Sequence, residues 1–245
     1  MNIDVIISAS DIKEEKTKDK VVVVIDVLRA TSVMVTALNN GCTEVIPVSH
    51  VEEAREIVKD NREKYILGGE RNALKIEGFD YSNSPLDYTR ENIQGKTLVM
   101  TTTNGTKAIK NVKGADRIFI ASMINGKAVA DKLIELNKDV VFINAGTYGQ
   151  FSMDDFITSG YIIDLIKRGA ETELTDIAVT SNYVYSSNKD IFSFVKNASH
   201  YKRILELGLK EDLDYCLSKD LIHIVPEYKD GKINIWYKET YLINS

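Results

Sequence analysis

The sequence is poor in cysteine, histidine and proline. Among 245 residues there are only two cysteines, three histidines and three prolines. Cys42 and Cys216 lie far apart and outside any C-x-x-C motif, which argues against a disulfide framework and suits a reducing cytoplasm. The histidines, His50, His200 and His223, are too scattered for a histidine-rich zinc site. Any bound metal is therefore expected to have oxygen ligands, as magnesium or manganese does.

Excess positive charge and long apolar runs are also absent. The formal net charge is −5, which argues against a nucleic-acid partner because such proteins carry a basic face. It does not exclude a small anionic ligand, because a local site can be basic on an acidic protein. No apolar run approaches the roughly 20 residues of a membrane span, and the first residues do not resemble a signal peptide. We therefore expect a cytoplasmic protein without a membrane or nucleic-acid partner; assembly into a homo-oligomer stays open.

Short apolar runs alternate with amphipathic stretches up to residue 143. The runs VVVVI, LVM, IFI and VVFI suit strands that are buried on both faces. This alternation predicts an α/β fold, with helices flanking a mostly parallel or mixed sheet. The expected strands are Asp4–Ile7, Val21–Ile25, Glu44–Val48, Tyr65–Leu67, Thr97–Met100, Arg117–Ile120 and Val140–Ile143. The expected helices are Ser32–Asn39, Val51–Asn61, Thr106–Val112 and Gly126–Asn137.

The pattern becomes helical in the later part of the chain. Helices are expected over Ser152–Lys167, near Glu173–Ser187, and over Lys189–Lys196, Ser199–Leu207 and Glu211–Ser218. The segments His223–Val225 and Lys232–Lys238 could form late strands at a sheet edge. Nothing marks a linker, so we expect a single domain over residues 1–245, with 152–225 as an optional helical subdomain. The aperiodic segment Gly68–Tyr88 is rich in glycine and aromatics, which favours an ordered functional loop.

The most hydrophobic expected strand ends on an acid in the motif VVVVIDVLRATS. Asp26 follows the valines, and Arg29 and Thr31 lie in the turn and at the start of the next helix. Ligands of parallel sheets bind at the carboxyl ends of strands, and the N–H groups of a helix start form an anion site. These groups suit a phosphate or sulfonate with a divalent cation. The structural alternative is that Asp26 pairs with Arg29 and caps the turn.

Two further expected strands also end on polar motifs. In GGERN, Glu70 is a candidate metal ligand and Arg71 a candidate anion clamp, or the two form an ordinary surface pair. In MTTTNGTKAI, backbone N–H and hydroxyl groups could cradle an oxyanion, with Lys107 close by, or the motif is an ordinary β–α turn. The candidate residues of this turn are Thr102, Thr103, Asn104 and Gly105. Neither a Walker A nor a G-x-G-x-x-G spacing occurs.

Two helix starts in the later part of the chain carry acids or a histidine. In NAGTYGQFSMDDFITSG, Asp155 is a candidate metal ligand, or it forms a capping box with Ser152. Its neighbour Asp154 is rotated roughly 100° around the helix, so both are not expected to face one cation. In NASHYKRILELG, we expect His200 and Arg203 to form an exposed polar face, with a substrate-facing histidine as the alternative.

Together these segments predict a crevice in which carboxylates, hydroxyls and cations converge after several buried strands. Hard carboxylate ligands beside anion-binding groups fit magnesium-assisted chemistry on a phosphate ester.

The motifs VVVVIDVLRATSVMVTAL, GGER…IEGFDYSNSP, GKTLVMTTTNGTKAI and INAGTYGQFSMDDFITSG resemble, in order and spacing, the 2-phosphosulfolactate phosphatase family. The later SHYKRILELGLKEDLDYC is similar to the C-terminal part of that family, so the resemblance spans about Val21 to Pro226. It implies a three-layer α/β/α fold and a magnesium-dependent phosphatase that converts (2R)-2-phospho-3-sulfolactate to 3-sulfolactate and phosphate, a step of coenzyme M biosynthesis in methanogens. The residues at its motif positions are Asp26, Arg29, Thr31, Glu70, Arg71, Asn83, Ser84, Thr102, Thr103, Asn104, Gly105 and Asp155.

A mechanism can be expected from this resemblance. The substrate carries phosphate, sulfonate and carboxylate groups, for which Arg29, Arg71 and Lys107 are candidate partners. Either Asp26 attacks phosphorus, or metal ions orient an attacking water. The D-x-D motif of the haloacid-dehalogenase phosphatases would need an acid at Leu28, which favours the water route. Asp26, Glu70 and Asp155 are then the expected magnesium ligands, and Arg29 with the Thr102–Gly105 turn stabilises the phosphoryl oxygens.

Two alternatives stay open at this point. The substrate could be another small phosphorylated hydroxy acid, or the chain could be a non-catalytic module that binds an anion or a nucleotide.

Overall fold

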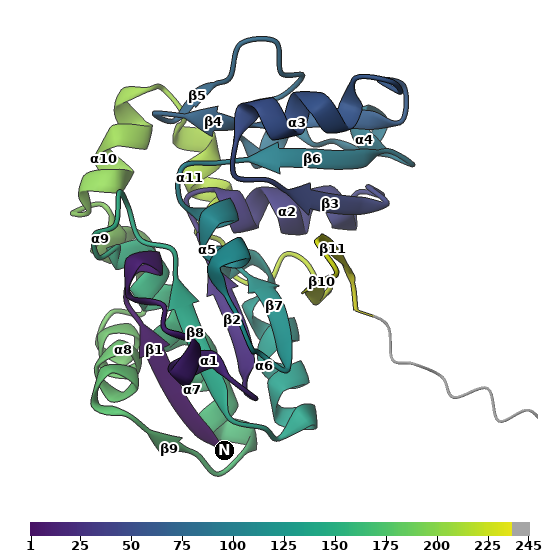
Figure 1. Cartoon of the computed structure of the whole chain (residues 1–245). Coiled ribbons are helices and arrows are strands. Elements are labelled where there is room, and N and C mark those ends of the chain that lie inside the picture. The colour runs from purple at the N-terminus through teal and green to yellow at the C-terminus, as the bar shows by residue number, and fades with distance from the viewer. Residues whose placement is uncertain (237–245) are drawn as a thin grey trace, which may run out of the picture.

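The computed structural model describes residues 1–236 and shows one large sheet with helices on both of its faces (Figure 1). Within these residues the sheet has 11 strands, in the order β5-β4-β6-β3-β11-β10-β7-β2-β8-β1-β9. The strands are β1 (Asn2–Ile6), β2 (Val21–Ile25), β3 (Glu44–Pro47), β4 (Tyr65–Arg71), β5 (Leu74–Lys75), β6 (Thr97–Thr101), β7 (Arg117–Ala121), β8 (Val140–Asn144), β9 (Glu173–Leu174), β10 (Pro226–Lys229) and β11 (Lys232–Ile235). This mixed sheet confirms the predicted α/β class.

Most helices fall where they were predicted, with ends shifted by a few residues. The two four-residue helices, over residues 14–17 and 90–93, were not predicted, and the stretch expected to be helical near Glu173–Ser187 begins with the short strand β9. The helices are α1 (Glu14–Thr17), α2 (Ala30–Asn39), α3 (Val51–Val58), α4 (Arg90–Ile93), α5 (Gly105–Asn111), α6 (Gly126–Leu136), α7 (Met153–Gly169), α8 (Asp176–Ser187), α9 (Ile191–Val195), α10 (Ser199–Glu206) and α11 (Lys210–Cys216). No helix within the described range is long and apolar enough to cross a membrane. The division of the chain into a domain and a helical subdomain stays a prediction.

Strand β2 lies in the middle of the molecule and explains the unbroken valine run. It pairs in parallel with β7 on one side and with β8 on the other. Val21, Val23 and Ile25 pack into a core that includes residues of α6 and α7. Val22 and Val24 pack into a separate core that includes residues of α2 and α5. A strand buried on both faces has no polar face, so the run of branched apolar residues follows from the three layers.

The C-terminal hairpin β10–β11 corrects the prediction of an edge strand. It lies between two parallel groups of strands and pairs with β7 at Glu227–Phe119 and with β3 at Ile233–Val45 (Figure 1). The expected strand His223–Val225 is irregular, and the strand begins at Pro226 instead. Of the expected strand Lys232–Lys238, residues 237–238 lie outside the described part. Each strand of the hairpin has only four residues. Such a short sequence does not indicate which strands of the sheet it pairs with.

Candidate active site

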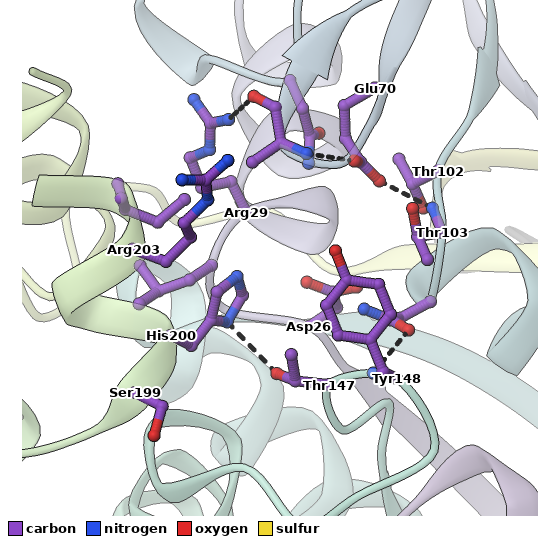
Figure 2. A pocket seen from close by; sticks show the side chains of 15 residues that line it. Asp26, Arg29, Glu70, Thr102, Thr103, Thr147, Tyr148, Ser199, His200 and Arg203 are labelled. Carbon is purple, nitrogen blue, oxygen red and sulfur yellow. Dashed lines mark hydrogen bonds between the residues drawn. The ribbon is translucent and has the colours of Figure 1, made fainter. Parts of the chain in front are cut away.

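A cavity of about 240 Å³ lies at the carboxyl ends of β2, β4, β6 and β8, and helix α10 forms its remaining wall (Figure 2). The predicted convergence of the segments that follow these strands is therefore seen in the structure. The cavity is lined by Asp26, Leu28, Arg29, Glu70, Ala73, Asn83, Thr102, Thr103, Asn104, Thr147, Tyr148, Ser199, His200, Arg203 and Ile204. The Oδ1 atom of Asn83 is buried and has no hydrogen-bond partner within residues 1–236, as expected of a group that contacts a ligand.

Asp26 sits in the turn between β2 and α2, and the backbone fixes its position. The Thr31 hydroxyl donates to the Asp26 carbonyl at 2.8 Å, and the Ala30 N–H donates to Asp26 Oδ1 at 3.2 Å. Asp26 therefore caps the start of α2, as the structural alternative proposed, and also lines the cavity. Burial raises its pKa to about 6, and the negative charges of Asp154 and Glu70 add to this rise. A nearby cation would relieve that repulsion.

Gly105, the first residue of α5, packs closely against Ala30 and the Asp26 carboxylate. A Cβ at this position would fall 2.6 Å from the Ala30 Cβ and 2.6 Å from Asp26 Oδ2. We expect Gly105→Ala to displace the Asp26 carboxylate and to lower kcat more than tenfold. It should also cost about 1–3 kcal/mol of stability, the usual range for overpacking. Steady-state kinetics and thermal unfolding would measure both effects. An alanine variant with wild-type kcat would mean that the position of Asp26 is not critical.

Arg29 does not pair with Asp26, so that part of the structural alternative is wrong. Its guanidinium forms a buried ion pair with Asp212 of α11, and the second oxygen of Asp212 accepts a hydrogen bond from Ser84 at 2.6 Å. Arg29 is 1% exposed, and its Nε has no hydrogen-bond partner among the described residues. Arg29 therefore joins the C-terminal helices to the cavity. Ser84 lies behind the cavity wall and orients Asp212.

Glu70 lies near the end of β4 and accepts hydrogen bonds on both carboxylate oxygens. The Thr103 N–H donates to Oε1 at 2.7 Å, and the Ala73 N–H donates to Oε2 at 2.8 Å. These bonds hold the carboxylate against the cavity and leave lone pairs on each oxygen. Asn104 in turn accepts a hydrogen bond from the Tyr148 N–H at 3.2 Å, which links the β6 and β8 turns.

Arg71 and Lys107 lie outside the cavity lining. The Arg71 side chain turns back and donates to the Thr101 hydroxyl at 2.9 Å and to the Glu70 carbonyl at 2.7 Å. Lys107 is exposed on α5. Adjacent strand residues point to opposite faces, so Glu70 and Arg71 could not both enter the cavity from a regular strand.

Asp155 is a buried residue that holds two loops together. Its Oδ1 accepts from the Val27 N–H at 2.9 Å, and its Oδ2 accepts from the Gly146 N–H at 3.0 Å. It thereby ties the turn after β2 to the turn after β8, and the predicted capping box with Ser152 is absent. Burial raises its pKa well above the ordinary value, and the carboxylates of Asp154 and Asp26 raise it further. A role of Asp155 as a metal ligand stays a prediction.

His200 and Arg203 both line the cavity from α10 (Figure 2). Arg203 is 53% exposed, as expected for a polar face, but His200 is only 18% exposed, so for His200 that interpretation is wrong. The signal was present in the helical spacing. His200 and Arg203 share one face of the helix with Ile204, which is only 1% exposed. This position beside a buried residue places His200 and Arg203 at the border of the buried face of α10, where a side chain can line a cavity.

The chemistry of the cavity fits a magnesium ion held by few protein ligands. Within residues 1–236, no three histidine, cysteine or acidic side chains gather closely enough to form a metal site. Magnesium is commonly bound by one or two carboxylates, and waters and substrate phosphate complete its coordination. Asp26 and Glu70 both line the cavity, together with the hydroxyls of Thr102 and Thr103. This oxygen-rich set matches that mode of binding.

Comparisons with known proteins agree with the resemblance seen in the motifs. The sequence model of the family 2-phosphosulpholactate phosphatase matches residues 6–231. A protein of Clostridium novyi named probable 2-phosphosulfolactate phosphatase is 64% identical over 95% of this chain and 99% of its own length. Proteins with the same name in Clostridium tetani and Clostridium acetobutylicum are 64% and 62% identical, again over 95% of this chain and 100% of their own length. The chain therefore belongs to the 2-phosphosulfolactate phosphatase family.

Proposed function

We propose that this chain is a magnesium-dependent phosphatase that hydrolyses 2-phospho-3-sulfolactate to 3-sulfolactate and phosphate in the cavity described above. The observation that carries the proposal is the composition of the lining. Asp26 and Glu70 face the same cavity as Arg29, His200 and Arg203. A metal-assisted reaction on a multiply charged phosphate ester needs carboxylates that bind the cation and positively charged side chains that bind the anionic groups. The family and its named relatives support the choice of substrate.

Within this proposal, Asp26 and Glu70 hold the magnesium ion. The bound ion would neutralise charge on the phosphoryl oxygens and activate water for attack. The Thr102–Asn104 turn binds the phosphoryl group, and Thr31, Gly105 and Asp155 fix the position of Asp26. The absence of an acid at Leu28, which lines the cavity, continues to favour attack by water over an aspartyl-phosphate.

We propose that Arg29 and Arg203 bind the non-phosphoryl anionic groups of the substrate. They lie on different elements of the cavity wall, the start of α2 and α10. Guanidinium groups match the geometry of carboxylates and other planar or tetrahedral oxyanions. Among the residues that the structure describes, Arg203 has only Glu206 as a partner, at 3.9 Å on the surface, so its charge is available to a ligand.

Arg203→Ala should therefore weaken substrate binding more than catalysis. We expect the KM for 2-phosphosulfolactate to rise about tenfold with little change in kcat, because one charge-assisted hydrogen bond contributes about 1.5–3 kcal/mol. Lys202→Ala is the matched control, because Lys202 has the same charge on the same helix and lies outside the cavity lining. Equal effects of the two substitutions would show that the substrate responds to the total positive charge of α10 and not to a specific contact with Arg203.

The function is tested by phosphate release from 2-phosphosulfolactate, 2-phospholactate and 2-phosphoglycolate with magnesium present. We expect the highest kcat/KM for 2-phosphosulfolactate. A preference for another ester would reassign the substrate within the same chemistry. Thermal stabilisation by these ligands without any turnover would instead support a non-catalytic binding module and contradict the proposal.

A further inference from the structure

His200 is held in a defined orientation at the wall of the cavity. Its Nδ1 lies 3.3 Å from the Thr147 hydroxyl and 3.8 Å from Asp154 Oδ2. Its other ring nitrogen, Nε2, therefore points away from both groups and toward the cavity (Figure 2). An imidazole that is anchored through one nitrogen presents the other to a ligand.

Asp154 is a buried acid whose position suits it to hold a charged imidazole. It is 1% exposed, lies in the first turn of α7 and accepts a hydrogen bond from the Ser152 hydroxyl. Burial raises the pKa of Asp154, but the interactions with His200 and the hydrogen bond from Ser152 together outweigh it, so the pKa is lowered. Burial likewise lowers the pKa of His200, but the nearby acids, Asp154 foremost, together outweigh it, so the pKa of His200 is raised. Both shifts favour the ion pair near neutral pH.

We propose that His200 is a catalytic residue that donates its Nε2 proton to the ester oxygen of the substrate as the P–O bond breaks, and that Asp154 positions it. The inference rests on the proposed phosphatase function. In this step water adds its oxygen to phosphorus and gives one proton to solvent. The bond between phosphorus and the ester oxygen breaks, and that oxygen keeps the electron pair and takes the Nε2 proton. The products are the free alcohol and phosphate, and neutral His200 regains its proton from solvent.

The leaving group of this reaction needs such a donor. The alcohol of a hydroxy acid is a weak acid, so it leaves poorly as an alkoxide, and a positioned acid typically accelerates such a step 10²–10⁴-fold. Within the described lining, Arg29 and Arg203 cannot release a proton near neutral pH. Asp26 and Glu70 are proposed to hold the metal. Histidine is the lining side chain whose ordinary pKa lies near the working pH.

The charges around His200 come from several elements. Asp154 on α7 and Asp26 after β2 both raise its pKa, and Arg29 at the start of α2 lowers it. Arg203 lies on its own helix, three residues on. Asp154, which is not among the proposed metal ligands, lies 3.8 Å from Nδ1, so its charge faces the ring and stabilises the protonated form that a proton donor requires.

The decisive experiment compares two substrates that differ only at the scissile atom. In the second, sulfur replaces the ester oxygen, and a thiolate leaves without protonation. We expect His200→Gln to lower kcat for the oxygen ester about 10²-fold and to change kcat for the sulfur ester little. Equal losses on both esters, or no loss on either, would overturn the proposal. A wild-type protein that cleaves neither would instead remove the phosphatase function itself.

The pH profile gives an independent test with the oxygen ester alone. In the wild type, kcat should fall as pH rises through the pKa of His200, and this limb should be lost in His200→Gln. Asp154→Asn should move the limb to lower pH, because the raised pKa depends on the Asp154 charge. His223→Gln, at an exposed position outside the cavity, should leave the profile unchanged. Thermal unfolding would confirm that each variant folds; a limb that persists in His200→Gln would contradict the proposal.

Discussion

Asp26→Asn is expected to reduce turnover of 2-phosphosulfolactate by at least about 10³-fold while the protein stays folded. The loss follows because an amide cannot supply the negative charge that holds a divalent cation, and such a cation contributes several kcal/mol to the transition state, at about 1.4 kcal/mol per tenfold in rate. Stability should change little. Asparagine caps helices as well as aspartate, so it can keep the hydrogen bond from Ala30. It also removes a charge from beside Glu70 and Asp154.

The control for this variant is a surface acid treated in the same way. Asp116 forms an ion pair with Lys138 at 2.9 Å on the surface, and such pairs contribute little to stability. Asp116→Asn should therefore have wild-type kinetics. If Asp26→Asn retains activity near the wild type, the reaction takes place elsewhere and the proposed site is misplaced.

Removal of magnesium is expected to have an effect of similar size. With excess EDTA, phosphate release should fall by at least about 10³-fold and return when magnesium is added in excess over the chelator. The metal should also stabilise the folded chain, because it would bind the native cavity and not the unfolded state. Added magnesium should therefore raise the melting temperature of the wild type, even without substrate, and have no such effect on Asp26→Asn.

Glu70→Gln refines the same prediction. Glutamine keeps one acceptor for the Thr103 or Ala73 N–H but lacks the charge, so we expect half-maximal activation to need more magnesium. Full turnover in EDTA, with no response of the melting temperature to magnesium, would show that Asp26 and Glu70 do not bind a magnesium ion.

Much of the parallel part of the fold follows from local sequence. The unbroken VVVVI and VVFI runs predicted β2 and β8 because a strand covered by helices on both faces has no polar residues. The hairpin β10–β11 was misplaced because its position depends on which distant strands remain unpaired. Its contacts to β7 and β3 are single register pairs between residues far apart in the chain. No local pattern encodes such pairing.

The candidate site was predictable where a residue follows a buried strand. Asp26, Glu70 and the Thr102–Asn104 turn reach the cavity because parallel strands bring their carboxyl ends to one edge. The contacts of Arg29 and His200 were not predictable. Arg29 pairs with Asp212, which lies 183 positions later in the chain, and His200 enters the cavity because α10 packs over the strand ends. Both depend on tertiary packing, which the motifs do not describe.

The most direct test of the account is a crystal structure with magnesium and the products of the reaction bound. We expect the metal to contact Asp26 and Glu70, the phosphate to lie against the Thr102–Asn104 turn, and the sulfolactate to extend toward Arg29 and Arg203. A phosphate or metal bound outside this cavity, or a phosphoryl group attached to Asp26, would contradict the proposed site or its mechanism.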